Sequence, residues 1–307
     1  MAAITASLVN ELRQLTGAGM MQCKAALTEA EGDLQKAREI LRIKLGKKAE
    51  GRLERQASEG AVFARISADR RIGVIIELNS ETDFVARNDQ FKALGQSLVE
   101  KLLSYAAGTV PADQDAFLAD TMEEGKTVAA YINDAAAPIG EKVALGRFER
   151  FGAPEGNAVA AYVHNPGGSG DDGGRIGVLV ELTGADADAL STLGREIALH
   201  IASSNPQYLA EGDVEPAMIE KEREIARAQA AEDPKMAGKP AQAIESMVNG
   251  RVRRFLEETV LLKQAYVRDP AKTVEAIVKE TAGAGIVRFV RFKVGELQAD
   301  QPAEEQA

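Results

Sequence analysis

The sequence predicts an α+β protein with antiparallel sheets and separately grouped helices. Two segments each contain two apolar stretches joined by a polar turn, which is typical of a β-hairpin, and apolar residues at helical spacing follow each of them. Two more strands are expected at Val143–Phe151 and Val287–Val294. Because the strands occur in hairpins and do not alternate one by one with helices, the pattern favours an α+β fold over a parallel βαβ fold.

Length and composition indicate a folded protein of two or three domains. The chain has 307 residues, of which 45% are hydrophobic and 27% are charged, ordinary values for a globular protein. Its formal net charge of −10 disfavours general nucleic-acid binding, so we expect no direct nucleic-acid partner. The first basic residue is Arg13 and no apolar stretch approaches the roughly 18 residues that span a bilayer. We therefore expect a cytoplasmic protein without membrane association.

Residues 1–50 predict three short amphipathic helices. Gly17 and Gly32 are suited to end the first two helices, and Asp33 is suited to cap the start of the third. The apolar faces consist of Ile4, Leu8, Leu12 and Leu15, then Met20, Cys23 and Leu27, then Leu34, Ala37, Leu41 and Leu45. A basic segment with few apolar residues, 47–56, follows as a linker.

The two predicted hairpins are similar in sequence. The first comprises residues 61–66 and 72–78, and the second comprises residues 158–163 and 176–182. Residues 71–78 match the eight residues that begin at Arg175, with identities or conservative replacements at an offset of 104 residues. Because a hairpin followed by a helix occurs in both places, we predict a duplicated lobe.

The remaining chain predicts a helical hairpin and a final strand. Helical segments on both sides of the Pro- and Gly-containing stretch 233–240 extend from Pro216 to about Val260. The narrow apolar stripe of the first helix predicts that this hairpin projects from the body, and the acidic residues 299–307 predict a disordered tail. The expected divisions are an N-terminal helical module 1–55, core lobe 1 at 56–140, core lobe 2 at 141–210, the helical hairpin 211–262, a C-terminal module with the final strand at 263–298, and the tail 299–307.

Catalytic and nucleotide-binding motifs are incomplete in this sequence. Residues 17–22 lack the third glycine and the preceding strand of a dinucleotide fingerprint, the Gly-Lys pairs at 125–126 and 238–239 lack the rest of a P-loop, and Ser169 lacks the glycine of a nucleophile elbow. Cys23, the single cysteine, lies on an apolar helix face and predicts a buried thiol. One thiol and two histidines cannot supply a conventional four-ligand zinc site. We predict no enzyme, no cofactor and no metal site.

Two segments are unusual for a purely structural domain. In residues 79–88, Ser80 or Thr82 could cap a helix, and Phe84 either packs in the core in helical phase with Phe91 or forms an exposed acid–aromatic wedge with Asp83. In residues 16–21, two adjacent methionines follow a glycine-containing turn. Because neighbouring helix residues cannot both face inward, at least one of them is expected at the surface, where Met often marks a protein-binding patch.

These two segments resemble the signature motifs of the elongation factor Ts family. The first motif runs from Ile4 to Val9, through Leu12-Arg13 and residues 16–21, to Cys23-Lys24. The second motif is Glu77-Leu78-Asn79 leading into residues 81–88. The resemblance covers nearly the whole chain, to about Glu296, and it agrees with the duplicated lobe and the helical hairpin.

The resemblance implies a guanine-nucleotide exchange factor for bacterial elongation factor Tu, with a ubiquitin-associated-like N-terminal bundle of three helices, a two-lobed core, a helical hairpin and a C-terminal module. It implies that the segment Thr82, Asp83, Phe84 and Val85 enters the GTPase and helps to dislodge its Mg²⁺ ion. It also implies further contact positions at Met20, Met21, Lys24, Ile139, Gly140 and His164. His200 is expected to be a packed helix residue.

The expected partner is elongation factor Tu in its GDP-bound and nucleotide-free forms. The helical hairpin could support a homodimer within a 2:2 complex. The alternative function is a non-catalytic protein-binding scaffold that uses the N-terminal bundle on another partner.

Overall fold

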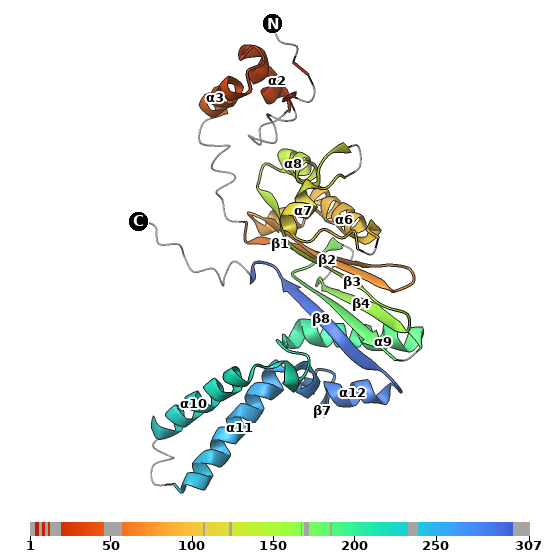
Figure 1. Ribbon diagram of the computed structural model, residues 1–307, viewed down its shortest axis with the longest axis vertical. Helices are drawn as coiled ribbons and strands as arrows, with labels where there is room; N and C mark the ends of the chain where they lie inside the picture. The colour runs from red at the N-terminus through yellow and green to blue at the C-terminus, as the bar shows by residue number, and fades with distance from the viewer. Residues whose placement is uncertain are drawn as a thin grey trace.

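The computed structural model describes residues 4–5, 8–9, 12, 20–45, 57–106, 108–122, 125–166, 168, 172–184, 186–232 and 239–296 (Figure 1). Its centre consists of two three-stranded antiparallel sheets with strand orders β1-β2-β3 and β4-β5-β8. Helices and antiparallel strands are grouped separately, so the predicted α+β class is confirmed. The strands are β1 (Glu59–Ile66), β2 (Ile72–Ser80), β3 (Val143–Gly152), β4 (Asn157–His164), β5 (Ile176–Thr183) and β8 (Gly285–Lys293).

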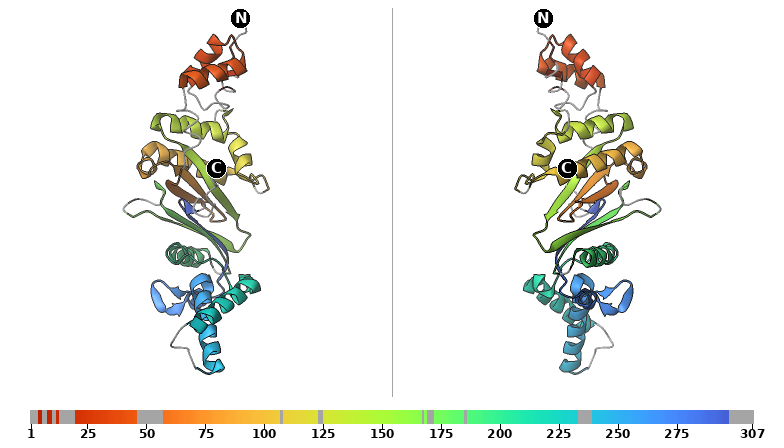
Figure 2. Two further views of the ribbon diagram at one scale, coloured as in Figure 1. Left: turned by 90° about the vertical axis from the view of Figure 1, so that its left-hand side faces the viewer. Right: turned by 90° about the vertical axis from the view of Figure 1, so that its right-hand side faces the viewer.

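Helices cover the outer face of each sheet, and the two sheets pack against each other between them (Figures 1 and 2). The first sheet and its helices enclose one apolar core, and the second sheet and its helices enclose another. The first set comprises α5 (Asp83–Ala86), α6 (Asp89–Ser104), α7 (Gln114–Ala119) and α8 (Val128–Ile139), and the second comprises α9 (Ala187–Ser204) and α12 (Val274–Glu280). This arrangement matches the two lobes expected from the repeated hairpins.

Strand pairing corrects the expected membership of two strands. β3 pairs with β2, although the expected division at residue 140 assigned it to the second lobe. β8 pairs with β5, so the final strand completes the sheet of the second lobe. Both pairings join segments that are far apart in the chain, and local hydrophobic patterns carry no information about such partners.

The duplication extends to the third strands, which the sequence analysis did not detect. Residues 147–151 (RFERF) and 288–292 (RFVRF) occupy equivalent positions, because Phe151 pairs with Gly73 and Phe292 pairs with Gly177. A register shift also falls in the corresponding stretch of both sheets, between Ile76 and Leu78 in β2 and between Glu181 and Leu182 in β5. Each lobe is therefore one copy of the same three-stranded unit.

Equivalent residues of the two lobes build a shared core between the sheets. Its buried members are Val62, Ile75, Phe151 and Ala153 from the first lobe, and Val159, Leu179, Phe292 and Val294 from the second. A Cβ atom on Gly73 would lie 2.4 Å from Val159 Cγ1, and one on Gly177 would lie 2.4 Å from Val62 Cγ1. Because neither glycine has a Cβ atom, Gly73 of the first sheet lets Val159 of the second approach closely, and Gly177 of the second sheet does the same for Val62 of the first.

Two ion pairs, each to a buried glutamate, repeat this symmetry. Arg147 Nε lies 2.8 Å from Glu77 Oε2 in the first lobe, and its guanidinium stacks 4.3 Å from the ring of Phe292 in the second. Arg288 Nε lies 2.7 Å from Glu181 Oε2, and its guanidinium stacks 4.1 Å from the ring of Phe151. Each arginine therefore neutralises a glutamate of its own sheet and packs on the opposite sheet.

The helical hairpin projects away from the sheets (Figure 1). It consists of α10 (Pro216–Glu232) and α11 (Ala241–Thr259), and the described buried residues of α10 are only Ala226 and Ala230. The narrow apolar stripe predicted for this helix is therefore confirmed. Short elements surround its base: η3 (Glu211–Asp213), η4 (Leu261–Lys263), β6 (Ala265–Tyr266) and β7 (Asp269–Thr273).

In the N-terminal module the structure describes α2 (Met20–Glu29) and α3 (Leu34–Leu45). Asp33 Oδ1 accepts hydrogen bonds from the N–H groups of Gln35 (2.9 Å) and Lys36 (3.0 Å), so the predicted cap of the third helix is confirmed. Cys23 is fully buried, also as predicted. Most of the predicted first helix lies outside the described residues, as do the linker 47–56 and the tail 299–307, and these remain predictions.

Candidate functional site

The loop that follows β2 carries the segment 82–85 and is held at its base by polar contacts. Ser80 Oγ donates a hydrogen bond to the carbonyl oxygen of Thr82 at 2.8 Å. Thr82 occupies the N-cap position of α5, but its hydroxyl donates to the carboxylate of Glu141 at 3.0 Å rather than accepting from the helix backbone. Ser80 and Thr82 were both predicted as capping residues, but neither side chain caps α5.

The short helix α5 presents one aromatic side chain to solvent. Val85 is buried in the core of the first lobe, whereas Phe84 is 77% exposed. Asp83 Oδ2 forms an ion pair with Arg87 Nη2 at 3.0 Å, and both side chains are substantially exposed. Val85 therefore anchors the helix, and the acid–aromatic pair Asp83 and Phe84 lies on its outer side.

Phe84 was expected either in the core or at the surface. The break between helices α5 and α6 decides between these two positions. α5 ends at Ala86, and Asn88 begins α6 by accepting a hydrogen bond from the Gln90 N–H at 2.8 Å. Because the two helices are separate, the helical phase from Phe84 to Phe91 is lost. Phe91 is fully buried, and the interpretation of Phe84 as a core residue is wrong.

A second predicted contact, Ile139 with Gly140, lies close to this loop. Ile139 is the last residue of α8, and Gly140 ends that helix with φ of 83°, a left-handed conformation that glycine adopts without strain. The next residue, Glu141, is the one that binds Thr82. The structure thus brings together two segments about sixty residues apart in sequence, and the family resemblance had named both of them.

The predicted contact residues of α2 share one exposed face. Met20 is 49% exposed, Met21 is 76% exposed, and Lys24 is also exposed. Cys23 and Leu27, which were predicted to share one apolar face with Met20, are fully buried, so Met20 lies at the edge of that face and is only partly covered. The prediction that at least one methionine lies at the surface is confirmed, because both do.

His164 lies at the exposed end of β4. Its Nδ1 atom is 3.0 Å from the hydroxyl oxygen of Tyr162. The neighbouring residues Gly174 and Arg175 bond to the early part of β1, through a backbone bridge to Val62 and an ion pair with Glu59. Glu59 pairs with Ser80, so this end of the second hairpin lies beside the strand ends from which the loop to α5 begins.

The second histidine, His200, has a structural role, as expected. It is fully buried, its Nδ1 accepts a hydrogen bond from the Val267 N–H at 3.2 Å, and its Nε2 lies 2.9 Å from Gln264 Oε1. Since Nδ1 is the acceptor, the neutral ring carries its proton on Nε2 and donates it to Gln264. Burial lowers the pKa of His200, because the charged form loses its hydration.

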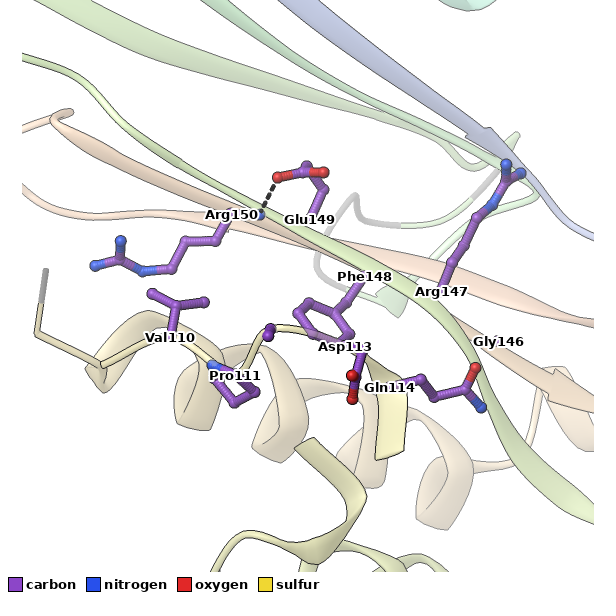
Figure 3. Close-up of a pocket in the computed structure, with 10 residues that line it drawn as sticks. Val110, Pro111, Asp113, Gln114, Gly146, Arg147, Phe148, Glu149 and Arg150 are labelled. Atoms are coloured by element: carbon purple, nitrogen blue, oxygen red, sulfur yellow. Dashed lines mark hydrogen bonds between the residues drawn. The ribbon is translucent and has the colours of Figure 1, made fainter. Parts of the chain in front are cut away.

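An open depression of about 340 Å³ lies between β3 and the segment 110–114 (Figure 3). Two arginines line it, and both form hydrogen bonds with the protein: Arg147 with Glu77, and Arg150 Nη2 with the carbonyl oxygen of Tyr105 at 2.8 Å. Phe148, which lies between them along β3, packs in the core of the first lobe. The two arginines at this depression are thus engaged in contacts within the protein.

A metal-ligating cluster and a membrane-spanning helix are both absent from the described ranges. There, no group of three or more His, Cys, Asp or Glu side chains is placed to hold a metal ion. Among these same residues, no helix is both long and apolar enough to cross a membrane.

Sequence reasoning missed two residues at the site, Glu81 and Glu141. Glu81 Oε1 accepts a hydrogen bond from the backbone N–H of Lys142 at 2.6 Å, and Glu141 binds Thr82. Both glutamates are neighbours of residues that were named, Glu81 of Thr82 and Glu141 of Gly140. Their contacts cross between distant segments, so no local spacing could have identified them.

Comparison with known proteins identifies the family of the chain. The family model described as "Elongation factor TS" matches residues 81–296. A curated "Elongation factor Ts" of Acidothermus cellulolyticus is 43% identical over 97% of this chain and 100% of the relative, and that of Bordetella petrii is 46% identical over 96% and 93%. The corresponding protein of Methylococcus capsulatus is 44% identical over 95% of this chain and 92% of the relative. The chain therefore belongs to the elongation factor Ts family of translation elongation factors.

Proposed function

We propose that the chain binds elongation factor Tu and promotes exchange of its GDP for GTP. The observation that carries the proposal is the exposure of Phe84 on a helix anchored by buried Val85. Exposed aromatic side chains on a fixed base are typical anchors of protein interfaces, because they bury a large area with little loss of side-chain freedom. The adjacent Asp83 adds a negative charge at the same tip.

The proposed mechanism requires no catalytic group on this chain. Mg²⁺ offsets much of the phosphate charge of a bound nucleotide, so a conformation of the GTPase that holds Mg²⁺ poorly also holds GDP poorly. Of the predicted segment, Val85 is buried in the first lobe and Thr82 is bound to Glu141, so the inserted part is the exposed tip of Asp83 and Phe84. Its insertion needs only to favour that conformation. By linkage, the exchange factor weakens GDP binding by the same factor by which GDP weakens binding of the exchange factor.

The remaining contact residues extend the proposed interface. Met20, Met21 and Lys24 form an exposed face on α2, which suits an adaptable protein contact. Ile139 and Gly140 lie beside the loop of α5, and His164 lies at the end of the second hairpin. We propose that these positions contact the same partner and that the N-terminal module is a three-helix, ubiquitin-associated-like bundle. A homodimer through the helical hairpin, within a 2:2 complex, is part of the same proposal.

The test is the release of fluorescent GDP from bacterial elongation factor Tu at fixed Mg²⁺ concentration. The unaltered chain should accelerate release strongly, and the double variant Asp83→Ala/Phe84→Ala should not. Val267→Ala is a matched control, because Val267 is also an exposed apolar residue, 40% accessible, but belongs to the β6–β7 turn. Full acceleration by the double variant would reject the wedge, and no acceleration by the unaltered chain would reject the exchange function.

A further inference from the structure

Two glutamates connect the loop before α5 to the junction of α8 and β3. Glu141 Oε2 accepts from the backbone N–H of Thr82 at 3.1 Å, and both of its oxygens lie 3.0 Å from Thr82 Oγ1. Glu81 Oε1 accepts from the backbone N–H of Lys142 at 2.6 Å. Each glutamate therefore binds the residue that follows the other glutamate in the chain. We call these four residues the glutamate clasp.

The clasp fixes Thr82, the residue that directly precedes α5. Thr82 is held at both its backbone N–H and its hydroxyl, and hydrogen bonds to a charged acceptor are stronger than those between neutral groups. Three residues later, Val85 is buried in the core of the first lobe. Phe84 lies between these two fixed points and makes up most of the exposed tip.

A helix of four residues has no stability of its own, because too few hydrogen bonds offset the ordering of its backbone. Its orientation therefore depends on the contacts at its two ends. If α5 were free to move, ordering it on a partner would lower the affinity of the complex. Holding it in place before binding removes that loss.

We propose that Glu81 and Glu141 are positioning residues that hold Phe84 ready to insert into the partner. The inference rests on the proposed function, since it gives Phe84 its role there. It differs from a general stabilising role, because none of the four clasp residues belongs to the buried apolar core of the first lobe. Their removal should release the tip while the lobe stays folded.

The chain contains no tryptophan, which allows a direct measurement of the tip without the partner. A Phe84→Trp variant places a single fluorophore on α5, and time-resolved anisotropy reports its local motion.

Adding Glu141→Ala should increase the amplitude of this motion. Adding Glu141→Gln should restore part of the restraint, because an amide oxygen still accepts from Thr82. Glu155→Ala, at an exposed glutamate in the turn between β3 and β4, should leave the motion unchanged. Equal local motion with and without Glu141→Ala would overturn the positioning role.

A double-mutant cycle on GDP release connects the clasp to the reaction. Glu141→Ala should slow exchange by about tenfold when Phe84 is present, the size expected for losing charged hydrogen bonds. In the Phe84→Ala background the same change should have little effect, because the residue it positions is missing. An equal loss in both backgrounds would contradict positioning of Phe84.

The two measurements separate this inference from the proposed function. Exchange that is insensitive to Phe84→Ala would remove the functional role of the tip, while the anisotropy would still decide whether the clasp restrains it. Thermal unfolding of each variant, followed by circular dichroism, checks that the lobe remains folded.

Discussion

The two lobes share one framework and differ where the first carries the candidate site. Their sheets have the same strand order and equivalent register, and α6 and α9 pack at equivalent places, with Gly95 against Phe63 and Gly194 against Ala160. The connection from β2 to α6 and the connection from β5 to α9 differ in length. Twelve residues lead from Asn79 to Phe91, the first buried residue of α6, whereas seven lead from the equivalent Thr183 to Leu190 in α9.

The five additional residues of the first lobe correspond to the loop and helix α5. In the second lobe Asp186 caps α9 directly, by accepting from the N–H groups of Asp188 and Ala189. In the first lobe the chain forms α5 before Asn88 caps α6. The comparison teaches that the framework needs only the short connection, so the longer one is available for function.

The largest expected effect comes from making the two connections alike. Replacing residues 80–89 with residues 184–188 gives the first lobe the shorter connection in register. Exchange should fall by about a hundredfold or more, because the aromatic anchor is removed. Circular dichroism should show an unchanged fold. Retained exchange by this variant would mean that α5 is not the active part.

The ion pairs of the two buried glutamates provide a second comparison between the lobes. Arg147→Met leaves the side chain of Glu77, only 4% exposed, without its cation, and we expect a loss of about 3 kcal/mol in the free energy of unfolding. Arg288→Met should have a smaller effect, because Arg288 is 46% exposed whereas Arg147 also donates to the Lys293 carbonyl oxygen. Urea denaturation measures both variants. Equal losses would contradict this asymmetry.

The reciprocal glycine contacts predict equal effects in the two lobes. Gly73→Ala and Gly177→Ala each place a Cβ atom against a buried valine, and each should destabilise the protein by about 2 kcal/mol. Val62→Ala should reduce the destabilisation caused by Gly177→Ala but not that caused by Gly73→Ala, because only the Cβ atom added at position 177 contacts Val62. Thermal unfolding of the single and double variants tests this selectivity. Relief of both by Val62→Ala would show that the two contacts are not independent.

The smallest effect is a pH dependence that belongs to the second lobe. Burial lowers the pKa of His200, so the folded state favours the neutral ring. The contribution of neutral His200 to the free energy of unfolding is complete above the pKa of the unfolded state, near 6.5. It is lost as the pH falls below that value, by at most about 1.4 kcal/mol per pH unit. Urea denaturation between pH 7.5 and about 5.5 should show this decline, and His200→Gln should flatten it. His164→Gln, at the exposed histidine, should leave the decline in place. If His200→Gln has the same pH profile as the unaltered protein, His200 is excluded as the source of the decline.

Local patterns were sufficient to predict the hairpins, the main helices and the duplicated lobe. They were not sufficient for the third strands, because the repeated segments that begin at Arg147 and Arg288 are 141 residues apart, whereas the hairpins repeat at 104. Different insertions precede the two strands, so a search at one offset misses them. The pairing of β3 with β2 likewise depends on a contact between distant segments.

At the candidate site the sequence named candidate residues but did not determine their orientation. The helical spacing of Phe84 and Phe91 allowed a core position, and only the cap at Asn88 separates them into two helices. The clasp between Glu81 and Glu141 depends on how α8 meets the first sheet. Such contacts follow from tertiary structure and leave no periodic pattern in the chain.

The most direct test of the central claim is the coupling between GDP and this chain on elongation factor Tu. GDP affinity should be measured by titration with and without a saturating amount of the chain, for the unaltered protein and for Phe84→Ala. If Phe84 acts on the nucleotide site, the unaltered chain weakens GDP binding strongly, and in Phe84→Ala this weakening approaches zero even when the variant is bound. If Phe84→Ala binds more weakly but, once saturating, weakens GDP binding as much as the unaltered chain does, then Phe84 is only an anchor and the account is contradicted.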